Sequence, residues 1–481
     1  MVNQQLQRQL TLFDVTNLVV GAIIGADIYV ASSFGAQYLG TFSLAVWVIA
    51  GGIAIVIALC FAQCAGTIPR VGGPYAYAKE AFGPFTGFVV GWSLWFAELI
   101  SLAVFPLAFT QYFMFFFPNL DPILQAVMKI LFVVFLASTN IVGVKAAGRT
   151  NDVLTIAKLA PLVFFSIAGI AWIFFNPSIA AANFTTPSPA FDFASFGTVL
   201  VLIFWAYAGF EISTIPAEEI SEPQKTIPKA IVLGIVIVIV FYLTTNAILF
   251  GVRNATLLAG DIAPLAKAGN SIFSSNALLA LVGGGIIGVG ALISVAGSNE
   301  SGMLGTSRLG YALAADGLFP RVFARVHPKF KTPYMSIAIQ SGMAIVAAII
   351  GSLKLLIAVS VFFMAVAYLA TCASIFMFRR RRLTQKFRLR GGLVIAALGI
   401  LLSAFLISQC TPVQIALGVA LLLAGVPIYI WYTPKKEITE LKETLLSREN
   451  ILKRVYAQER TFLAHALLHL KRWYRKATRK I

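Results

Sequence analysis

Long apolar stretches recur along most of this chain of 481 residues, and they restrict the folds that it can adopt. We identify about twelve of them, each long enough to cross about 30 Å of hydrocarbon at about 1.5 Å per helical residue. Charged residues make up only 12% of the sequence, whereas a soluble domain has about 25%. The sequence therefore predicts an all-α integral membrane protein. The expected spans are residues 15–38, 41–67, 85–117, 122–144, 152–175, 195–218, 229–251, 278–305, 334–351, 354–378, 391–409 and 412–432.

Basic residues are unevenly divided between the two sides of this arrangement. With the N-terminus placed inside, 32 of the 37 lysines and arginines fall in inner segments and 4 in outer loops. Because cytoplasmic segments carry such an excess, we expect a multi-pass protein of the cell membrane with both termini in the cytoplasm. The net charge of +18 is then a matter of topology, and we expect no nucleic-acid binding. No small-residue cleavage site follows the first span, so we expect no removable signal peptide.

Two spans are interrupted by glycine and carry an acid at the interruption. In the first, "GAIIGADIYV", Gly25 is followed by Asp27, and the sixth span contains Gly209, Glu211 and Pro216. If the core divides into two sets of five helices, these spans are the first helix of each set. Matching interruptions in two halves point to a transporter site near the middle of the membrane, where unwound backbone is tolerated only beside protein or a water-filled cavity. The alternative interpretation is a pair of kinked packing helices.

Five segments resemble, in the same order, motifs of the amino acid–polyamine–organocation superfamily. "GAIIGADIY" is similar to the first-helix motif, and the others are similar to the junction of helices two and three, to helix six with its loop, and to the loop after helix eight. The resemblance implies secondary transport by alternating access. It also implies a leucine-transporter-like fold of ten helices in two inverted repeats, with helices one and six discontinuous, followed by two peripheral helices. The five segments are residues 21–29, 69–95, 204–231, 307–320 and 326–334, within a likeness that covers roughly 10–430.

On such a fold we expect five parts. The last part is the C-terminal tail, residues 433–481, which has helical apolar spacing and a basic final third. This pattern predicts a helix that lies on anionic lipid of the inner leaflet or packs on the cytoplasmic loops. The parts are a cytoplasmic N-terminus (1–14), a ten-helix transport core (15–378), a basic cytoplasmic loop (379–390), two peripheral helices (391–432) and a basic amphipathic tail (433–481).

The resemblance also implies where a substrate binds. In this superfamily, backbone amides at the helix-one break hold the substrate carboxylate, and carbonyl oxygens at the helix-six break receive its amino group, as half-helix dipoles favour. Trp205 matches an aromatic residue that closes over the substrate, Gly209 matches the flexible point, and Glu98 matches the lining of the side-chain pocket. The implied carboxylate cradle is Ile24, Gly25, Ala26 and Asp27, and the implied amine side is Trp205, Ala206, Tyr207 and Ala208.

Lys158 lies in the fifth span, where a charged side chain costs about 3 kcal/mol. Burial favours the neutral form of a lysine, so this residue can gain and lose a proton near neutral pH. In the sodium-independent branches that the sequence resembles, a lysine on helix five takes the place of a sodium ion. We therefore expect protons as the coupling ion, or exchange, and no sodium requirement. The alternative is a permanent strut, with Lys158 paired with Asp27 or bound to carbonyl oxygens of the first span.

Three acids, Asp27, Glu98 and Glu211, lie in spans whose only base is Lys158. Each acid costs about 2.5–3.5 kcal/mol unless it is paired or hydrated. A cationic substrate would offset the excess charge, which favours a polyamine, a diamine or a basic amino acid. Asp27 replaces the glycine of the family motif, so it either faces such a substrate or neutralises Lys158. A neutral amino acid is the alternative substrate, and Glu211 is our second expected proton carrier.

Other classes of function have less support in the sequence. The basic tail is the only sequence feature that favours a sensor, which would bind amino acids without sustained transport. The sequence has no Ser/His/Asp set, zinc-ligand spacing or phosphate-binding loop, so we expect no enzyme, no cofactor and no metal. The expected partners are a small amino acid or amine and the lipid bilayer.

Overall fold

The computed structural model describes residues 10–70, 72–143, 149–214, 217 and 220–432, with the backbone alone for 149–157. In this part of the chain, nine helical stretches are long and apolar enough to cross a membrane, and three shorter apolar helices accompany them. Together they cover all twelve expected spans, and the prediction of an all-α membrane protein is confirmed. The N-terminal residues up to 9, the tail 433–481 and Pro216 lie outside the described residues.

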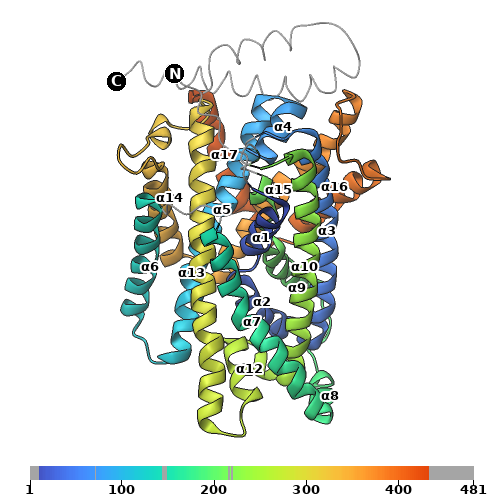
Figure 1. Ribbon diagram of the computed structural model, residues 1–481, viewed down its shortest axis with the longest axis vertical. Helices are drawn as coiled ribbons and strands as arrows, with labels where there is room; N and C mark the ends of the chain where they lie inside the picture. Colours follow the sequence, from blue (N-terminus) through green and yellow to red (C-terminus); the bar gives the residue numbers. More distant parts are fainter. Residues whose placement is uncertain (1–9, 71, 144–148, 215–216, 218–219, 433–481) are drawn as a thin grey trace, which may run out of the picture.

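Most of the long helices run along the long axis of the molecule (Figure 1). Four short helices connect or flank them: α4 (Pro74–Phe82), α8 (Pro177–Phe184), α11 (Ala255–Leu258) and α12 (Pro264–Ile272). The long helices are α3 (Ser43–Thr67), α5 (Pro84–Phe116), α6 (Pro122–Val142), α7 (Arg149–Phe175), α10 (Pro223–Val252), α13 (Ala277–Ala315), α14 (Tyr334–Ile350), α15 (Leu353–Arg380), α16 (Gly392–Ser408) and α17 (Pro412–Tyr432).

Several helices begin at side chains that cap the free N–H groups of a first turn. Thr11 and Asp14 form a reciprocal capping box at the start of the first helix. The Asp121 carboxylate accepts from Ile123 N–H before α6, and Asn276 caps α13 in the same manner. These starts lie within a few residues of the expected span boundaries, because the caps sit where the apolar pattern begins.

Two of the expected spans, the first and the sixth, are not continuous helices. The first span consists of α1 (Leu12–Ile23) and α2 (Asp27–Leu39), with three residues between them that are not helical. The sixth consists of α9 (Phe193–Phe204) followed by two short 3₁₀ turns, Trp205–Tyr207 and Phe210–Thr214. The five-part division and the two inverted repeats stay predictions, as does the side of the membrane on which each terminus lies.

α13 is longer than the sequence indicates. Residues 307–320 were expected to be a loop after the eighth helix, but α13 continues to Ala315, which makes it 39 residues long. At about 1.5 Å per residue it measures roughly 58 Å, well beyond the hydrocarbon thickness. Thr306, Ser307 and Arg308 interrupt the apolar run, so hydropathy ends the span at 305 although the helix continues. Just past its end, Asp316 accepts from Lys79 Nζ at 3.0 Å and from the Tyr75 hydroxyl at 2.5 Å, both in α4.

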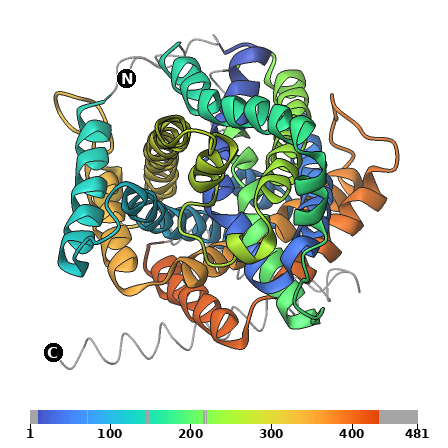
Figure 2. The same ribbon diagram turned by 90° about the horizontal axis from the view of Figure 1, so that it is seen from below.

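The helices differ sharply in how much of their surface is covered. α5 is almost entirely buried, whereas α6 and α17 are mostly exposed and lie at the periphery of the bundle seen end-on in Figure 2. Large apolar side chains such as Phe174 and Ile350 are 78% and 81% exposed. In a chain with this composition, such a surface faces lipid. The buried interior around α5 is therefore where a substrate site can lie.

Candidate functional site

The two interruptions touch each other. Gly209, between the 3₁₀ turns, has φ +120°, a conformation that favours glycine. A Cβ at this position would lie 2.8 Å from the Ala22 carbonyl oxygen and 3.1 Å from the Ile23 nitrogen. The backbone after α9 thus packs directly on the last turn of α1. Only glycine permits this approach.

Asp27 is held by groups of its own break and of α10. Its Oδ1 accepts from the Gly25 N–H at 2.8 Å, and its Oδ2 accepts from the Tyr242 hydroxyl at 2.6 Å. The side chain is 4% exposed. Among the described ion pairs there is none between Asp27 and Lys158 within 4.0 Å, so the direct pairing considered from the sequence is not present. Asp27 instead binds the Gly25 amide in the break that precedes α2.

Glu211 has the same construction at the second break. Its Oε2 accepts from the Gly209 N–H at 3.0 Å, and its Oε1 accepts from the Tyr368 hydroxyl of α15 at 2.8 Å. Each acid therefore stands two residues after a glycine, binds that glycine's amide and receives a tyrosine hydroxyl from another helix. The side chain of Glu211 is 2% exposed. The two breaks share one polar arrangement built from different helices.

Lys158 joins three helices. Its Nζ donates to the Gly21 carbonyl oxygen at 3.4 Å and to Ser298 Oγ at 3.1 Å, and the Ser298 hydroxyl also lies 3.1 Å from the Ile24 carbonyl oxygen. α7 is thereby connected to the end of α1 and to the middle of α13. Lys158 is buried, as are Asp27 and Glu211. All three surround the two breaks.

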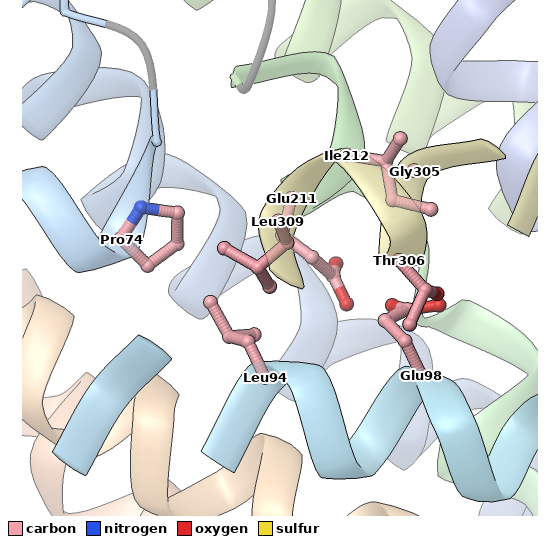
Figure 3. Close-up of a pocket in the computed structure, with 8 residues that line it drawn as sticks. All are labelled: Pro74, Leu94, Glu98, Glu211, Ile212, Gly305, Thr306 and Leu309. Carbon is pink, nitrogen blue, oxygen red and sulfur yellow. The ribbon is translucent and has the colours of Figure 1, made fainter. Parts of the chain in front are cut away.

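A small pocket lies beside the second break, between α5, the 3₁₀ turn that contains Glu211, and α13 (Figure 3). The carboxyl groups of Glu98 and Glu211 both point into it. Glu98 is half-buried and forms no hydrogen bond with the described part of the chain. The described lining contains no basic residue and consists of Pro74, Leu94, Glu98, Glu211, Ile212, Gly305, Thr306 and Leu309.

The expected amine side is tightly packed. Trp205 is 5% exposed, and its Nε1 donates to Ser101 Oγ of α5 at 3.1 Å. The Tyr207 hydroxyl donates to the Trp47 carbonyl oxygen of α3 at 3.0 Å. Hydrogen bonds thus anchor both aromatic side chains on neighbouring helices. The backbone of the turn lies between these two anchor points. Ala206 and Ala208 in this turn are buried, as are Ile24 and Ala26 in the first break.

Comparison with known proteins assigns the chain to a family. A sequence profile described as amino acid permease matches residues 10–432, nearly the whole described chain. The chain belongs to the amino acid permease family. This permease is 27% identical to the branched-chain amino acid permease BcaP of Bacillus subtilis (90% of this chain, 94% of the relative). It is 28% identical to the human Asc-type amino acid transporter 1 (92% and 86%) and 30% identical to the methylthioribose transporter of B. subtilis (69% and 72%).

The family membership decides two points of function. The permease is a multi-pass membrane transporter of a family that carries amino acids, and the prediction that it is not an enzyme is confirmed. The predicted site residues gather at the two breaks of this permease. Sequence reasoning missed Tyr242, Tyr368 and Ser298, which hold Asp27, Glu211 and Lys158. Their only signal is a polar group inside a long apolar span.

Gly297 of α13 provides the room in which Lys158 lies. A Cβ there would be 2.5 Å from Lys158 Cε. We expect Gly297→Ala to displace the lysine from Gly21 and Ser298 and to slow uptake by about tenfold, because overpacking costs about 1–3 kcal/mol. Uptake of labelled substrate into proteoliposomes measures this effect. Gly285→Ala is the matched control, since Gly285 is also in α13 and nothing lies within 4 Å of its Cβ position. Equal rates in the two variants would contradict the prediction.

Proposed function

We propose that this permease is a sodium-independent, proton-coupled secondary transporter that works by alternating access and prefers a cationic substrate: a polyamine, a diamine or a basic amino acid. The observation that carries the proposal is the pocket beside the second break. Glu98 and Glu211 both line it, and no basic residue does so in the described chain. Both termini are proposed to lie in the cytoplasm.

The chemistry of the pocket favours an ammonium group. Each carboxyl group inside the membrane costs about 2.5–3.5 kcal/mol unless it is paired or hydrated. Glu211 has two hydrogen-bond donors in the protein, whereas Glu98 has none among the described residues. An ammonium placed between them would supply donors and opposite charge to both. The rest of the lining is largely apolar and includes the Pro74, Leu94 and Leu309 side chains.

Coupling is proposed to reside in Lys158, with Glu211 as a second proton carrier. The Lys158 ammonium is surrounded by the Gly21 carbonyl oxygen and Ser298 Oγ, which are oxygen ligands of the kind that a bound metal cation would use. A resident ammonium at this place makes a sodium ion unnecessary. Release of its proton would weaken the bonds between α7, α1 and α13, and so link protonation to movement of the first break.

A neutral amino acid is the second candidate substrate, and the relatives favour it. BcaP is named for branched-chain amino acids, and the exchanger SteT of B. subtilis is named for serine and threonine. One relative is named for methylthioribose, so the substrates for which the relatives are named are not confined to amino acids. A sensor without sustained transport is the candidate from another class, and accumulation of substrate in sealed vesicles would exclude it.

The test of the proposed function is competition for uptake in proteoliposomes. Putrescine, arginine, alanine and leucine are each added in excess over a labelled substrate in sodium-free buffer, with and without an inward proton gradient. We expect putrescine and arginine to compete more strongly than alanine and leucine, and collapse of the gradient to abolish accumulation. Competition by alanine and leucine alone would refute the cationic preference.

Replacement of Glu98 tests the pocket itself. We expect Glu98→Gln to weaken competition by the cationic substrate about tenfold, because one of two carboxylates loses its charge while its shape is kept. The concentration for half-maximal competition is the measurement. Glu222→Gln removes the same charge from an exposed residue that pairs with Lys225 at the surface, and it should leave this concentration unchanged. An equal effect in both variants would mean that the pocket does not bind the cation.

A further inference from the structure

Asp27 binds the Gly25 N–H, one of the amides that the family resemblance implies for a substrate carboxylate. We propose that its side chain takes the place of that carboxylate, so that the permease carries amines without a carboxyl group next to the amino group. The substrate class is then the decarboxylated amine rather than the parent amino acid. This inference rests on the proposed function and sharpens its choice of substrate.

The first argument is that the donor is already used. The Gly25 N–H is one of the amides expected to hold a substrate carboxylate, and it donates to Asp27 Oδ1 at 2.8 Å. The second carboxylate oxygen receives the Tyr242 hydroxyl at 2.6 Å. Both oxygens of Asp27 are therefore bound within the protein. An amide that donates to a resident carboxylate has little to offer an incoming one.

The second argument is space. A single carbon added at Gly25 would lie 2.9 Å from Ser298 Oγ and 3.2 Å from Asp27 Oδ1. The side-chain face of Gly25 is thus filled by Ser298 of α13 and by the Asp27 carboxylate, and the Gly25 N–H itself points at Asp27 Oδ1. A substrate carboxylate has three heavy atoms and cannot reach the Gly25 amide unless Asp27 moves away.

The third argument is charge. Asp27 has no ion-pair partner within 4.0 Å in the described chain, and the Lys158 ammonium is bound instead to Gly21 and Ser298. A second carboxylate at the break would lie beside the first, and like charges in a buried site repel strongly. An ammonium group meets no such repulsion, and the same holds at the second break, where Glu211 occupies the Gly209 N–H.

The experiment uses pairs of compounds that differ by one carboxyl group: agmatine with arginine, cadaverine with lysine, and isobutylamine with valine. Competition for uptake into proteoliposomes is measured for wild type, Asp27→Gly and Asp27→Asn. In wild type we expect each amine to compete at a concentration at least about tenfold lower than its amino acid. Asp27→Gly exposes the amide and should reverse this preference. Asp27→Asn keeps an acceptor for Gly25 but removes the charge, and should reduce the preference to an intermediate value.

A matched control separates this effect from loss of a carboxylate in general. Asp121→Asn removes an acid that caps α6 at an exposed position, and it should keep the wild-type preference. Should Asp27→Gly fail to fold, Asp27→Asn and the wild-type pairs still decide the matter. Equal competition by amine and amino acid in wild type, or a ratio that neither Asp27 variant changes, overturns the inference.

The valine pair distinguishes this inference from the proposed function. If arginine and lysine compete as well as agmatine and cadaverine, the inference fails while the preference for cations stands. If isobutylamine competes better than valine, but the diamines do not compete, the inference stands while the preference for cationic chains fails. Competition by valine alone overturns both.

Discussion

Replacing Lys158 with methionine is expected to lower proton-driven uptake by at least about a hundredfold. Methionine keeps most of the length of the side chain but lacks the ammonium that binds the Gly21 carbonyl oxygen and Ser298 Oγ. Hydrogen bonds to a charged group contribute about 1.5–3 kcal/mol each, so the connection between α7, α1 and α13 loses about 3–6 kcal/mol. A loss of 2.7 kcal/mol or more corresponds to about a hundredfold or more in rate.

The measurement compares uptake into proteoliposomes with and without an inward proton gradient in sodium-free buffer. Wild type should accumulate substrate only with the gradient, and Lys158→Met should show neither accumulation nor a response to the gradient. Lys129→Met removes a cation from the peripheral helix α6 and should behave as wild type. Full proton coupling retained in Lys158→Met would show that the lysine is a strut and that another group carries the proton.

Gly209→Ala is expected to destabilise the protein and abolish uptake. A φ of +120° is strained for alanine by about 1–3 kcal/mol. The added Cβ would also press on the Ala22 carbonyl oxygen at 2.8 Å, and overpacking of this kind adds about 1–3 kcal/mol. The backbone of α1 cannot yield without disturbing the Gly21 and Ile24 carbonyl oxygens that Lys158 and Ser298 bind.

Gly260→Ala isolates the contribution of the contact between the breaks. Gly260 also has positive φ, +71°, but nothing lies within 4 Å of its Cβ position. Its variant should show a small fall in the Tm of the detergent-solubilised protein and normal uptake, whereas Gly209→Ala should show a larger fall in Tm and no uptake. Similar Tm values and uptake rates in both variants would mean that the contact with α1 is unimportant.

The fold was largely predictable because lipid imposes a simple rule on sequence. The third span was expected at 85–117, and α5 occupies Pro84–Phe116. Membrane thickness sets a minimum apolar length, so hydropathy finds such a helix without knowledge of its neighbours. The same rule failed at the end of α13, where the helix continues past three polar residues, Thr306, Ser307 and Arg308.

The connections within the site could not be predicted in this way. The sequence identified Asp27 and Glu211 as unusual, because acids in apolar spans are costly. It gave no indication that Tyr242 would bind the first acid, 215 residues away, or that Tyr368 would bind the second, 157 residues away. Such contacts depend on how the helices pack, and a single sequence contains no record of helix packing. The question of whether Asp27 pairs with Lys158 therefore needed the structure.

The length of α13 has a mechanical consequence. Its middle is tied to the first break through Ser298, and its end is tied to α4 through Asp316. These two points are 18 residues apart, about 27 Å along the axis at about 1.5 Å per residue. A rigid rod of this length acts as a lever: a tilt of about 3° around Ser298 moves its far end by about 1.4 Å. That displacement is enough to break the 3.0 Å bridge between Lys79 and Asp316, so a small rearrangement beside the breaks would alter the contact between α13 and α4.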